Sequence, residues 1–182
     1  MRQTLIATVE NKPGVLNRVA SLFRRRNFNI DSLNVGRTGD SELSRMTIVV
    51  DRRNTEASMV EANLYKLVNV LDVQDVTDQP AVLRELALIK VAAAPEKRSE
   101  VISLADVFKA KVVDVGPESL ILQITTYEER IDSLIELLRP HGIVELVRTG
   151  HVAMMRGATD GVRHTPGAGP RVSTNGSNGK SK

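Results

Sequence analysis

The chain has 182 residues, of which 41% are hydrophobic and 26% are charged, so its composition is that of an ordinary folded protein rather than a disordered or membrane-embedded one. It contains no cysteine, which excludes disulfides, thiolate metal sites and a cysteine nucleophile. The formal net charge of +3 would suit a nucleic-acid partner, but the residues from Ala158 onward hold four cations and one aspartate, so the part before Ala158 is neutral.

Membrane insertion and secretion are not expected. No segment has the run of about 18 apolar residues that a membrane-spanning helix needs. A strand-like stretch begins only a few residues after Met1, which leaves no room for a signal peptide. We therefore expect a cytoplasmic protein.

The first elements along the chain are expected to be a strand and a helix. Residues 4–10 alternate in polarity and end in a turn-forming Asn-Lys-Pro-Gly stretch. Pro13 suits the first turn of a helix, where its missing N–H costs nothing. Apolar residues then recur at helical spacing over 15–23, and the three arginines at 24–26 suit the negative end of the helix dipole.

A hairpin is expected to follow this helix. Residues 28–38 and 43–51 are strand-like, and the turn-forming residues 39–42 join them. The parity of the apolar residues changes midway along the first of these strands, so a bulge is expected near Asp31 and Ser32. A bulged strand is often an edge strand.

A second helix and a fourth strand complete the first half. Asn54 or Thr55 can cap the helix. Residues 70–73 then predict a strand. The apolar residues expected on the buried face of the helix are Val60, Leu64 and Leu67.

The same order of elements starts again after a linker-like Asp-Gln-Pro stretch. Pro95 is expected to open the first helix of this half. Thr126 and Glu129 have the spacing of a capping box, which is expected to open the second helix. The expected strands are residues 85–93, 111–115, 120–125 and 143–147.

The repeated βαββαβ order predicts an α+β protein of two tandem ferredoxin-like domains, each a four-stranded antiparallel sheet with two helices on one face. The expected bounds are 1–78 for the first domain, 79–83 for a linker and 84–157 for the second domain. Residues 158–182 form a basic tail of mostly small and polar residues, which we expect to be disordered and to carry no fold-defining function.

A catalytic site is not expected in this chain. The histidines His141, His151 and His164 are scattered, without metal-ligand spacing or a neighbouring carboxylate pair. His141 precedes a glycine where a helix is expected to end, and a histidine there favours the helix dipole. The sequence has no nucleophile elbow, phosphate loop or dinucleotide fingerprint. We therefore expect neither enzymatic activity nor a metal ion in this chain.

The segment from Asn11 to Leu16 is the strongest candidate for a ligand site. Free N–H groups at a helix N-terminus attract an anion, and Gly14 has no side chain to keep a carboxylate away from the backbone. Asn11 offers a hydrogen-bond donor and an acceptor, as recognition of a free amino acid requires. The alternative is that Asn11, Pro13 and Gly14 only start the helix, and their spacing does not decide between the two interpretations.

Asn29 belongs to the expected edge strand. Two copies of a ferredoxin-like sheet can join edge to edge into one eight-stranded sheet, which satisfies exposed backbone groups and produces a dimer. Asn29 of one copy could then complete a pocket built on the Gly14 loop of the other. The alternative is that Asn29 is a turn residue after Asn27.

Residues 1–157 resemble the small subunits of acetohydroxyacid synthase (acetolactate synthase), whose first half is an ACT domain, a ferredoxin-like module that binds amino acids. The Pro-Gly-hydrophobic loop is typical of ACT domains in general. The Ser-Arg-Met-Thr-Ile stretch at 44–48 and the Lys-Leu-Val block at 66–68 are the signals that point to this subunit. The other matching segments are residues 10–16, 17–19, 28–33, 148–150 and 156–157.

The resemblance implies a regulatory subunit in branched-chain amino-acid biosynthesis. It implies that valine, or sometimes another branched-chain amino acid, binds between two ACT domains and causes feedback inhibition. It also implies a large catalytic subunit that carries thiamine diphosphate, magnesium and FAD, and that this chain activates or stabilises without binding those cofactors itself. The implied effector-binding residues are Asn11, Lys12, Pro13, Gly14, Val15 and Leu16 from one protomer, and Asn29 and Ile30 from the other.

Three other functions remain open at this stage. An ACT-domain regulator of a different amino-acid enzyme would share the fold and differ in its partner. An RNA-binding module is disfavoured, since such modules stack bases on aromatic residues of the central strands and residues 45–50 contain none. A self-contained enzyme would need a catalytic constellation that the sequence does not show.

Overall fold

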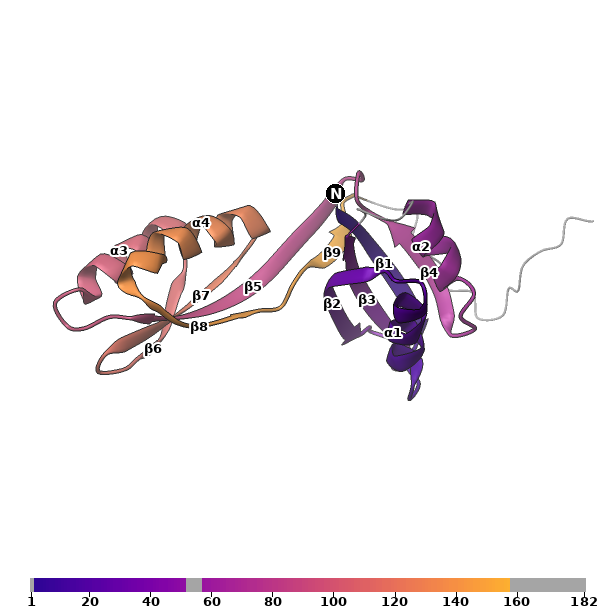
Figure 1. The fold of residues 1–182 in the computed structure, drawn as a ribbon, viewed down its shortest axis with the longest axis horizontal. Helices are drawn as coiled ribbons and strands as arrows, with labels where there is room; N and C mark the ends of the chain where they lie inside the picture. Colours follow the sequence, from indigo (N-terminus) through magenta and orange to yellow (C-terminus); the bar gives the residue numbers. More distant parts are fainter. Residues whose placement is uncertain (1, 52–56, 158–182) are drawn as a thin grey trace, which may run out of the picture.

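The computed structural model describes residues 2–51 and 57–157. The chain forms an elongated molecule with an α+β domain at each end and the long strand β5 between them (Figure 1). The predicted helix caps Asn54 and Thr55 and the predicted tail from residue 158 lie outside the described residues. None of the helices in the described ranges is long and apolar enough to cross a membrane.

The first domain has the predicted βαββαβ order. It is a four-stranded antiparallel sheet with the strand order β2-β3-β1-β4. Its elements are β1 (Arg2–Glu10), α1 (Val15–Arg25), β2 (Asn29–Arg37), β3 (Leu43–Asp51), α2 (Ala57–Leu64) and β4 (Val70–Asp75).

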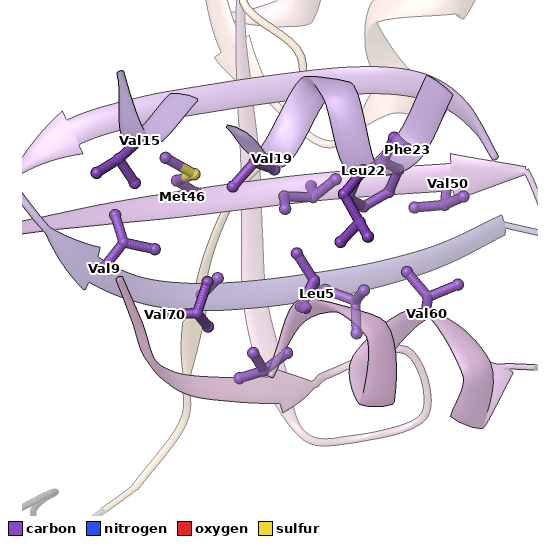
Figure 2. Packing of buried hydrophobic residues seen from close by; sticks show 14 residues of the cluster. Leu5, Val9, Val15, Val19, Leu22, Phe23, Met46, Val50, Val60 and Val70 are labelled. Carbon is purple, nitrogen blue, oxygen red and sulfur yellow. The ribbon is translucent and has the colours of Figure 1, made fainter. Parts of the chain in front are cut away.

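The core of this domain lies between the sheet and its two helices, and Figure 2 shows side chains of α1 lying over those of β1. Leu5, Val19 and Phe23 are almost completely buried there. The ring of Phe23 meets that of Phe28 edge-on, with the ring centroids 5.7 Å apart. Fully burying a large apolar side chain contributes roughly 1.5–3 kcal/mol, so these contacts fix the position of α1 on the sheet.

Strand β2 forms an edge of the sheet, as predicted. Its register against β3 shifts between Ile30 and Ser32, which confirms the predicted bulge and leaves Asp31 without an opposite partner on β3. β2 has no neighbouring strand on its outer side among the described residues. Its outer backbone groups can therefore pair with another strand.

The second domain repeats the order of the first, with a sheet in the order β6-β7-β5-β8 and two helices on one face (Figure 1). A short 3₁₀ helix, Arg139–His141, follows its last α-helix. The elements are β5 (Ala81–Ala92), α3 (Arg98–Phe108), β6 (Lys111–Val115), β7 (Ser119–Thr126), α4 (Glu128–Leu138) and β8 (Ile143–Arg148).

The connection between the domains differs from the sequence-based expectation. β5 begins at Ala81, so residues 81–83, which were expected to be linker, are part of a strand. A short strand that was not predicted, β9 (Val152–Met155), pairs with this start of β5. Ala153 of β9 packs with Ile6 on the face of the first sheet that the helices leave open. A two-stranded ribbon therefore joins the domains and packs on the first sheet.

The ends of the first two helices differ in detail from the prediction. α1 begins at Val15 with Gly14 as its N-cap, so the prediction that Pro13 lies in its first turn is wrong. α2 ends at Leu64, and Leu67, expected on the same helix, follows it while still packing against the core. The chain therefore enters α1 through a turn, and this turn shapes the candidate site.

The starts of the last two helices also differ. α3 begins at Arg98, three residues after Pro95, where the proline was expected to open it. The capping box predicted at Thr126 does not form, because Tyr127 is the N-cap of α4 and no side chain caps it. Glu128, the first residue of α4, instead pairs with Arg2 of the first domain. Glu128 therefore makes a contact between the domains, although only a local cap was expected in this segment.

Candidate functional site

Asn11 ties the loop before α1 to the turn of the β2–β3 hairpin. Its side-chain Nδ2 donates to the backbone oxygen of Ser41 at 2.8 Å, and its Oδ1 accepts from the hydroxyl of Ser44 at 3.2 Å. Its backbone N–H donates to the oxygen of Glu42 at 2.7 Å. An amide has two donor hydrogens and two acceptor lone pairs, so each end of the Asn11 amide has one further bonding position. Asn11 therefore fixes the shape of the loop and can still offer a donor and an acceptor.

Gly14 gives the loop an open backbone at the N-terminus of α1. It has φ +83°, in the left-handed region that favours glycine, and a Cβ built on it meets no atom of the described residues within 4 Å. No side chain caps this helix end and no acidic residue lies in its first turn. The first N–H groups of a helix have no partner within the helix and carry the positive end of its dipole. A carboxylate can therefore approach the backbone beside Gly14.

The other residues of the segment divide between the core and the solvent. Val15 is 4% exposed and packs in the core, whereas Leu16 is 46% exposed. The ammonium of Lys12 lies 3.2 Å from the carboxylate of Glu10. A hydrogen bond from Asn69, and after it one from Lys12, lowers the pKa of Glu10. Lys12 is thus already paired, and the helix end supplies the open positive potential.

Asn29 and Ile30 lie at the opposite end of the same domain from the Gly14 loop. Asn29 pairs with the last residue of β3, whereas Glu10, just before the loop, pairs with the first residue of β3. The length of β3, at about 3.3 Å per residue, separates the two ends by about 26 Å. Asn29 is exposed, and Ile30 is half-buried against the core. A single copy of the chain does not bring these residues to the loop.

A group of ion pairs lies where the two domains meet, and the sequence analysis missed it. The guanidinium of Arg148 contacts the buried carboxylate of Glu85 through two bonds of 2.9 and 2.6 Å, and it contacts Asp132 of α4 at 2.6 Å. The backbone N–H of Gly150 donates to Glu85 at 3.2 Å. Glu85 and Arg148 are 63 positions apart, so no local pattern could have paired them.

Arg2 and His151 extend this group across the boundary between the domains. Arg2 pairs with Asp31 of the β2 bulge at 2.9 Å and with Glu128 of α4 at 2.5 Å. Nε2 of His151 lies 3.3 Å from the same glutamate. These residues border a cavity of about 390 Å³, whose other lining residues are Ser32, Leu33, Val49, Glu85, Arg148, Thr149 and Gly150.

The ionised form of Glu85 is stabilised in the fold. Burial acts to raise its pKa, but the hydrogen bonds and charge of Arg148, with a smaller contribution from the Gly150 N–H, outweigh burial and lower its pKa from the ordinary 4.5. A lowered pKa in the folded state means that the ionised group contributes stability above pH 4.5, and that this stability is lost as the pH falls through the lowered value.

Replacing Glu85 by glutamine is expected to lower the free energy of unfolding by about 1–3 kcal/mol at pH 7, because one of its two bonds to Arg148 and the attraction between the two charges are lost. The deficit is expected to shrink as the pH falls through the lowered pKa of Glu85, because the wild-type carboxyl is then itself protonated. Urea unfolding of both proteins between pH 3 and pH 7 measures it. A deficit that does not change with pH would contradict an electrostatic role for Glu85.

The described histidines do not form a metal site. His141 ends the 3₁₀ helix, and His151 lies at the domain boundary. Within residues 2–51 and 57–157, no three histidine, aspartate or glutamate side chains gather as ligands of a metal ion would. His164 lies outside the described residues.

Comparison with protein-family models identifies both domains. Residues 5–72 match the model described as the AHAS small subunit-like ACT domain, and residues 84–157 match the model described as the small subunit of acetolactate synthase. Together with the ferredoxin-like fold, the first match places the chain in the class of ACT-domain proteins, which confirms the predicted fold class.

Whole-chain relatives identify the family. A probable acetolactate synthase small subunit of Archaeoglobus fulgidus is 50% identical over 157 residues, which cover 86% of this chain and 98% of the relative. The acetolactate synthase small subunit of Bacillus subtilis is 44% identical, with coverage of 86% and 92%. A crystal structure of the small subunit from Thermotoga maritima superimposes with a TM-score of 0.79 at 38% identity, covering 86% of this chain and 98% of that one. The chain belongs to the family of acetolactate synthase small subunits.

Proposed function

We propose that this chain is the regulatory subunit of an acetolactate synthase and that it binds L-valine between the ACT domains of two copies. The observation that carries the proposal is the placement of the two predicted halves of the site. The Gly14 loop lies at one end of the first sheet and Asn29 at the other, and β2, whose outer side pairs with no other described strand, runs between these ends.

Antiparallel pairing of two β2 strands would bring the two halves together. In such a pair the start of one strand lies beside the end of the other, so Asn29 of one copy would face the end of β2 of its partner. That end lies beside β3 near Ser44, which is bonded to Asn11 of the loop. Each dimer would then contain two sites, each made from the Gly14 loop of one copy and the Asn29 end of the other.

The chemistry of the loop suits a small apolar amino acid. The N–H groups of the first turn of α1 would receive the carboxylate, and the free lone pair of Asn11 Oδ1 would accept from the ammonium. The half-exposed Leu16 offers an apolar contact for a branched side chain. The side chain of Val15 is in the core and its backbone N–H donates to the oxygen of Lys12 at 3.3 Å, so Val15 would contribute by holding the shape of the loop.

The partner in this proposal is the large catalytic subunit. Thiamine diphosphate, magnesium and FAD are assigned to that subunit, and this chain is assigned no cofactor and no catalytic residue. Valine binding would lower the activity of the holoenzyme through a coupling free energy of about 1–3 kcal/mol, whereas the effector-free chain would activate or stabilise the catalytic subunit. The assembly would be cytoplasmic.

Two features of the first domain disfavour RNA binding. RNA-recognition modules of this fold bind bases on the open face of the central strands. In the first domain, Ala153 of β9 packs against this face beside Ile6, and β1 and β3 contain no aromatic residue.

Calorimetric titration of the purified chain with L-valine, followed by inhibition assays after reconstitution with the large subunit, tests the proposal. We expect saturable binding of valine and no binding of lysine, whose charged side chain finds no carboxylate in the loop. Leucine, isoleucine and unrelated amino acids are titrated in parallel. Absence of both binding and inhibition by valine would contradict the proposal, and selective binding of an unrelated amino acid would indicate an ACT regulator of another enzyme.

A further inference from the structure

The segment between β8 and β9 lies directly against the edge strand of the ACT domain. We call residues 149–151 the coupling segment. Gly150 approaches β2 so closely that a Cβ built on it would lie 2.4 Å from the Cβ of Ser32. Gly150 also has φ +74°, a conformation that other residues rarely adopt. Both the close approach and the backbone conformation therefore require glycine here.

A second residue of β2 holds the coupling segment by its backbone. Nδ2 of Asn34 donates to the oxygen of Thr149 at 2.8 Å and to the oxygen of His151 at 3.2 Å. Asn34 and Ser32 are two residues apart on β2, so they share one face of the strand. The coupling segment thus lies across that face and contacts two successive side chains on it.

The other side of the coupling segment is bound to the second domain. The N–H of Gly150 donates to Glu85 at 3.2 Å, and the hydroxyl of Thr149 accepts from the N–H of Leu86 at 3.1 Å. Glu85 is held by Arg148, which also reaches Asp132 of α4. A continuous series of contacts therefore runs from β2 through the coupling segment to β5 and α4.

The interface has bonding capacity that this arrangement does not use. Ser32 Oγ and His151 Nδ1 are buried and have no hydrogen-bond partner among the residues that the structure describes. Both residues line the cavity at the domain boundary. Buried polar atoms are nearly always paired, so water in this cavity or a second arrangement of the coupling segment can supply their partners. Interfaces that transmit a signal have two such arrangements rather than a continuous range.

We infer that the coupling segment transmits the state of β2, and with it the presence of the effector, to the second domain. The inference rests on the proposed function, because β2 is the strand that would pair in the effector-binding dimer. Valine and the pairing of β2 bias the position of Ser32 and Asn34. The coupling segment follows them and moves Glu85 and Arg148, which are attached to β5 and α4. Gly150 and Asn34 are positioning residues and do not touch the effector.

Gly150→Ala in the reconstituted holoenzyme tests the inference, with Gly157→Ala as the matched control. Gly157 has a similar φ of +79°, but a Cβ there meets no atom within 4 Å in the part of the chain that the structure describes, so both variants carry the backbone strain and only one disturbs β2. We expect both variants, as isolated chains without the large subunit, to bind valine within threefold of the wild type. We expect Gly150→Ala alone to lose at least half of the maximal inhibition, and Ser32→Gly, which removes the contacting Cβ, to restore it.

The thermodynamic linkage between valine and the large subunit gives a second measurement, which a loss of stability alone would not change. If valine and the large subunit are coupled, saturating large subunit must change the valine affinity of the wild type by the coupling factor, about 5- to 150-fold. In Gly150→Ala this factor is expected to fall below threefold. Asn34→Ala, which introduces no strain, is expected to reduce it in the same direction and serves if Gly150→Ala does not fold.

The outcomes separate this inference from the proposed function. A wild-type holoenzyme that neither binds valine nor responds to it would overturn both. A wild type that is inhibited, together with Gly150→Ala and Asn34→Ala variants that keep the full coupling factor, would overturn the role of the coupling segment and leave the effector site in place.

Discussion

Gly14→Asp is expected to abolish valine binding, with a loss of affinity of about 100-fold or more. The added carboxylate would point into open space beside the first turn of α1, because no atom within residues 2–51 and 57–157 lies within 4 Å of a Cβ at this position. It would occupy the N–H groups proposed for the ligand carboxylate and repel that carboxylate. Two like charges 4 Å apart cost about 1 kcal/mol in water and about 4 kcal/mol near a protein surface, a range that includes a 100-fold loss.

Gly14→Asn is the matched control. Asparagine has the same shape as aspartate without the charge, and both residues tolerate the left-handed conformation better than other side chains do. The control is therefore expected to retain valine binding within about tenfold, with the same circular dichroism and melting temperature as Gly14→Asp. Titration calorimetry with L-valine measures both variants. Equal loss in the two would show that shape matters at this position rather than charge, and unchanged binding by Gly14→Asp would place the site elsewhere.

Local patterns in the sequence were sufficient to predict the two domains. Each βαββαβ order follows from alternation in the strands and helical spacing of apolar residues, because these residues face a core within their own domain. The bulge at Asp31 was predictable from a change of parity, since a single extra residue reverses the face of every residue after it.

Contacts between the domains were not predictable in the same way. β9 has only four residues, and it is a strand because it pairs with the start of β5, some 70 positions earlier. The start of α4 was also not predictable from local patterns. Glu128 is bound by Arg2 across the domain boundary, and the predicted cap at Thr126 is absent. Such partners are close only after both domains have folded.

The candidate site was predictable in part. The open backbone of the Gly14 loop could be predicted from the local residue types, and the structure shows the open helix end that glycine and the turn produce. The engagement of Asn11 with Ser41 and Ser44 was not visible in the sequence, because it depends on the hairpin lying beside the loop. The ion pairs around Glu85 join residues that are far apart in the chain, and charged residues on a surface have no pattern that identifies their partners.

Val35→Lys is expected to convert the proposed dimer into a 20.0 kDa monomer and to abolish valine binding with it. Val35 lies on the edge strand β2 and is 44% exposed in the single chain. Pairing of two β2 strands would bury this apolar surface, whereas two lysines per dimer would place like charges at the junction, and a lysine on an edge strand disfavours strand pairing. Valine binding would be lost as well, because in the proposed dimer Asn29 would reach the Gly14 loop only from the partner.

Val113→Lys is the matched control for this prediction. Val113 is 49% exposed and lies on β6, the edge strand of the second sheet that corresponds to β2, so the chemical change and the edge-strand location are the same, although Val113 lies at a bulge and Val35 pairs with Met46. Sedimentation analysis is expected to show a dimer for this control and a monomer for Val35→Lys, with valine binding only in the control. A monomeric Val35→Lys variant that still binds valine would show that one chain holds the whole site, because a site shared between copies is lost when the dimer dissociates.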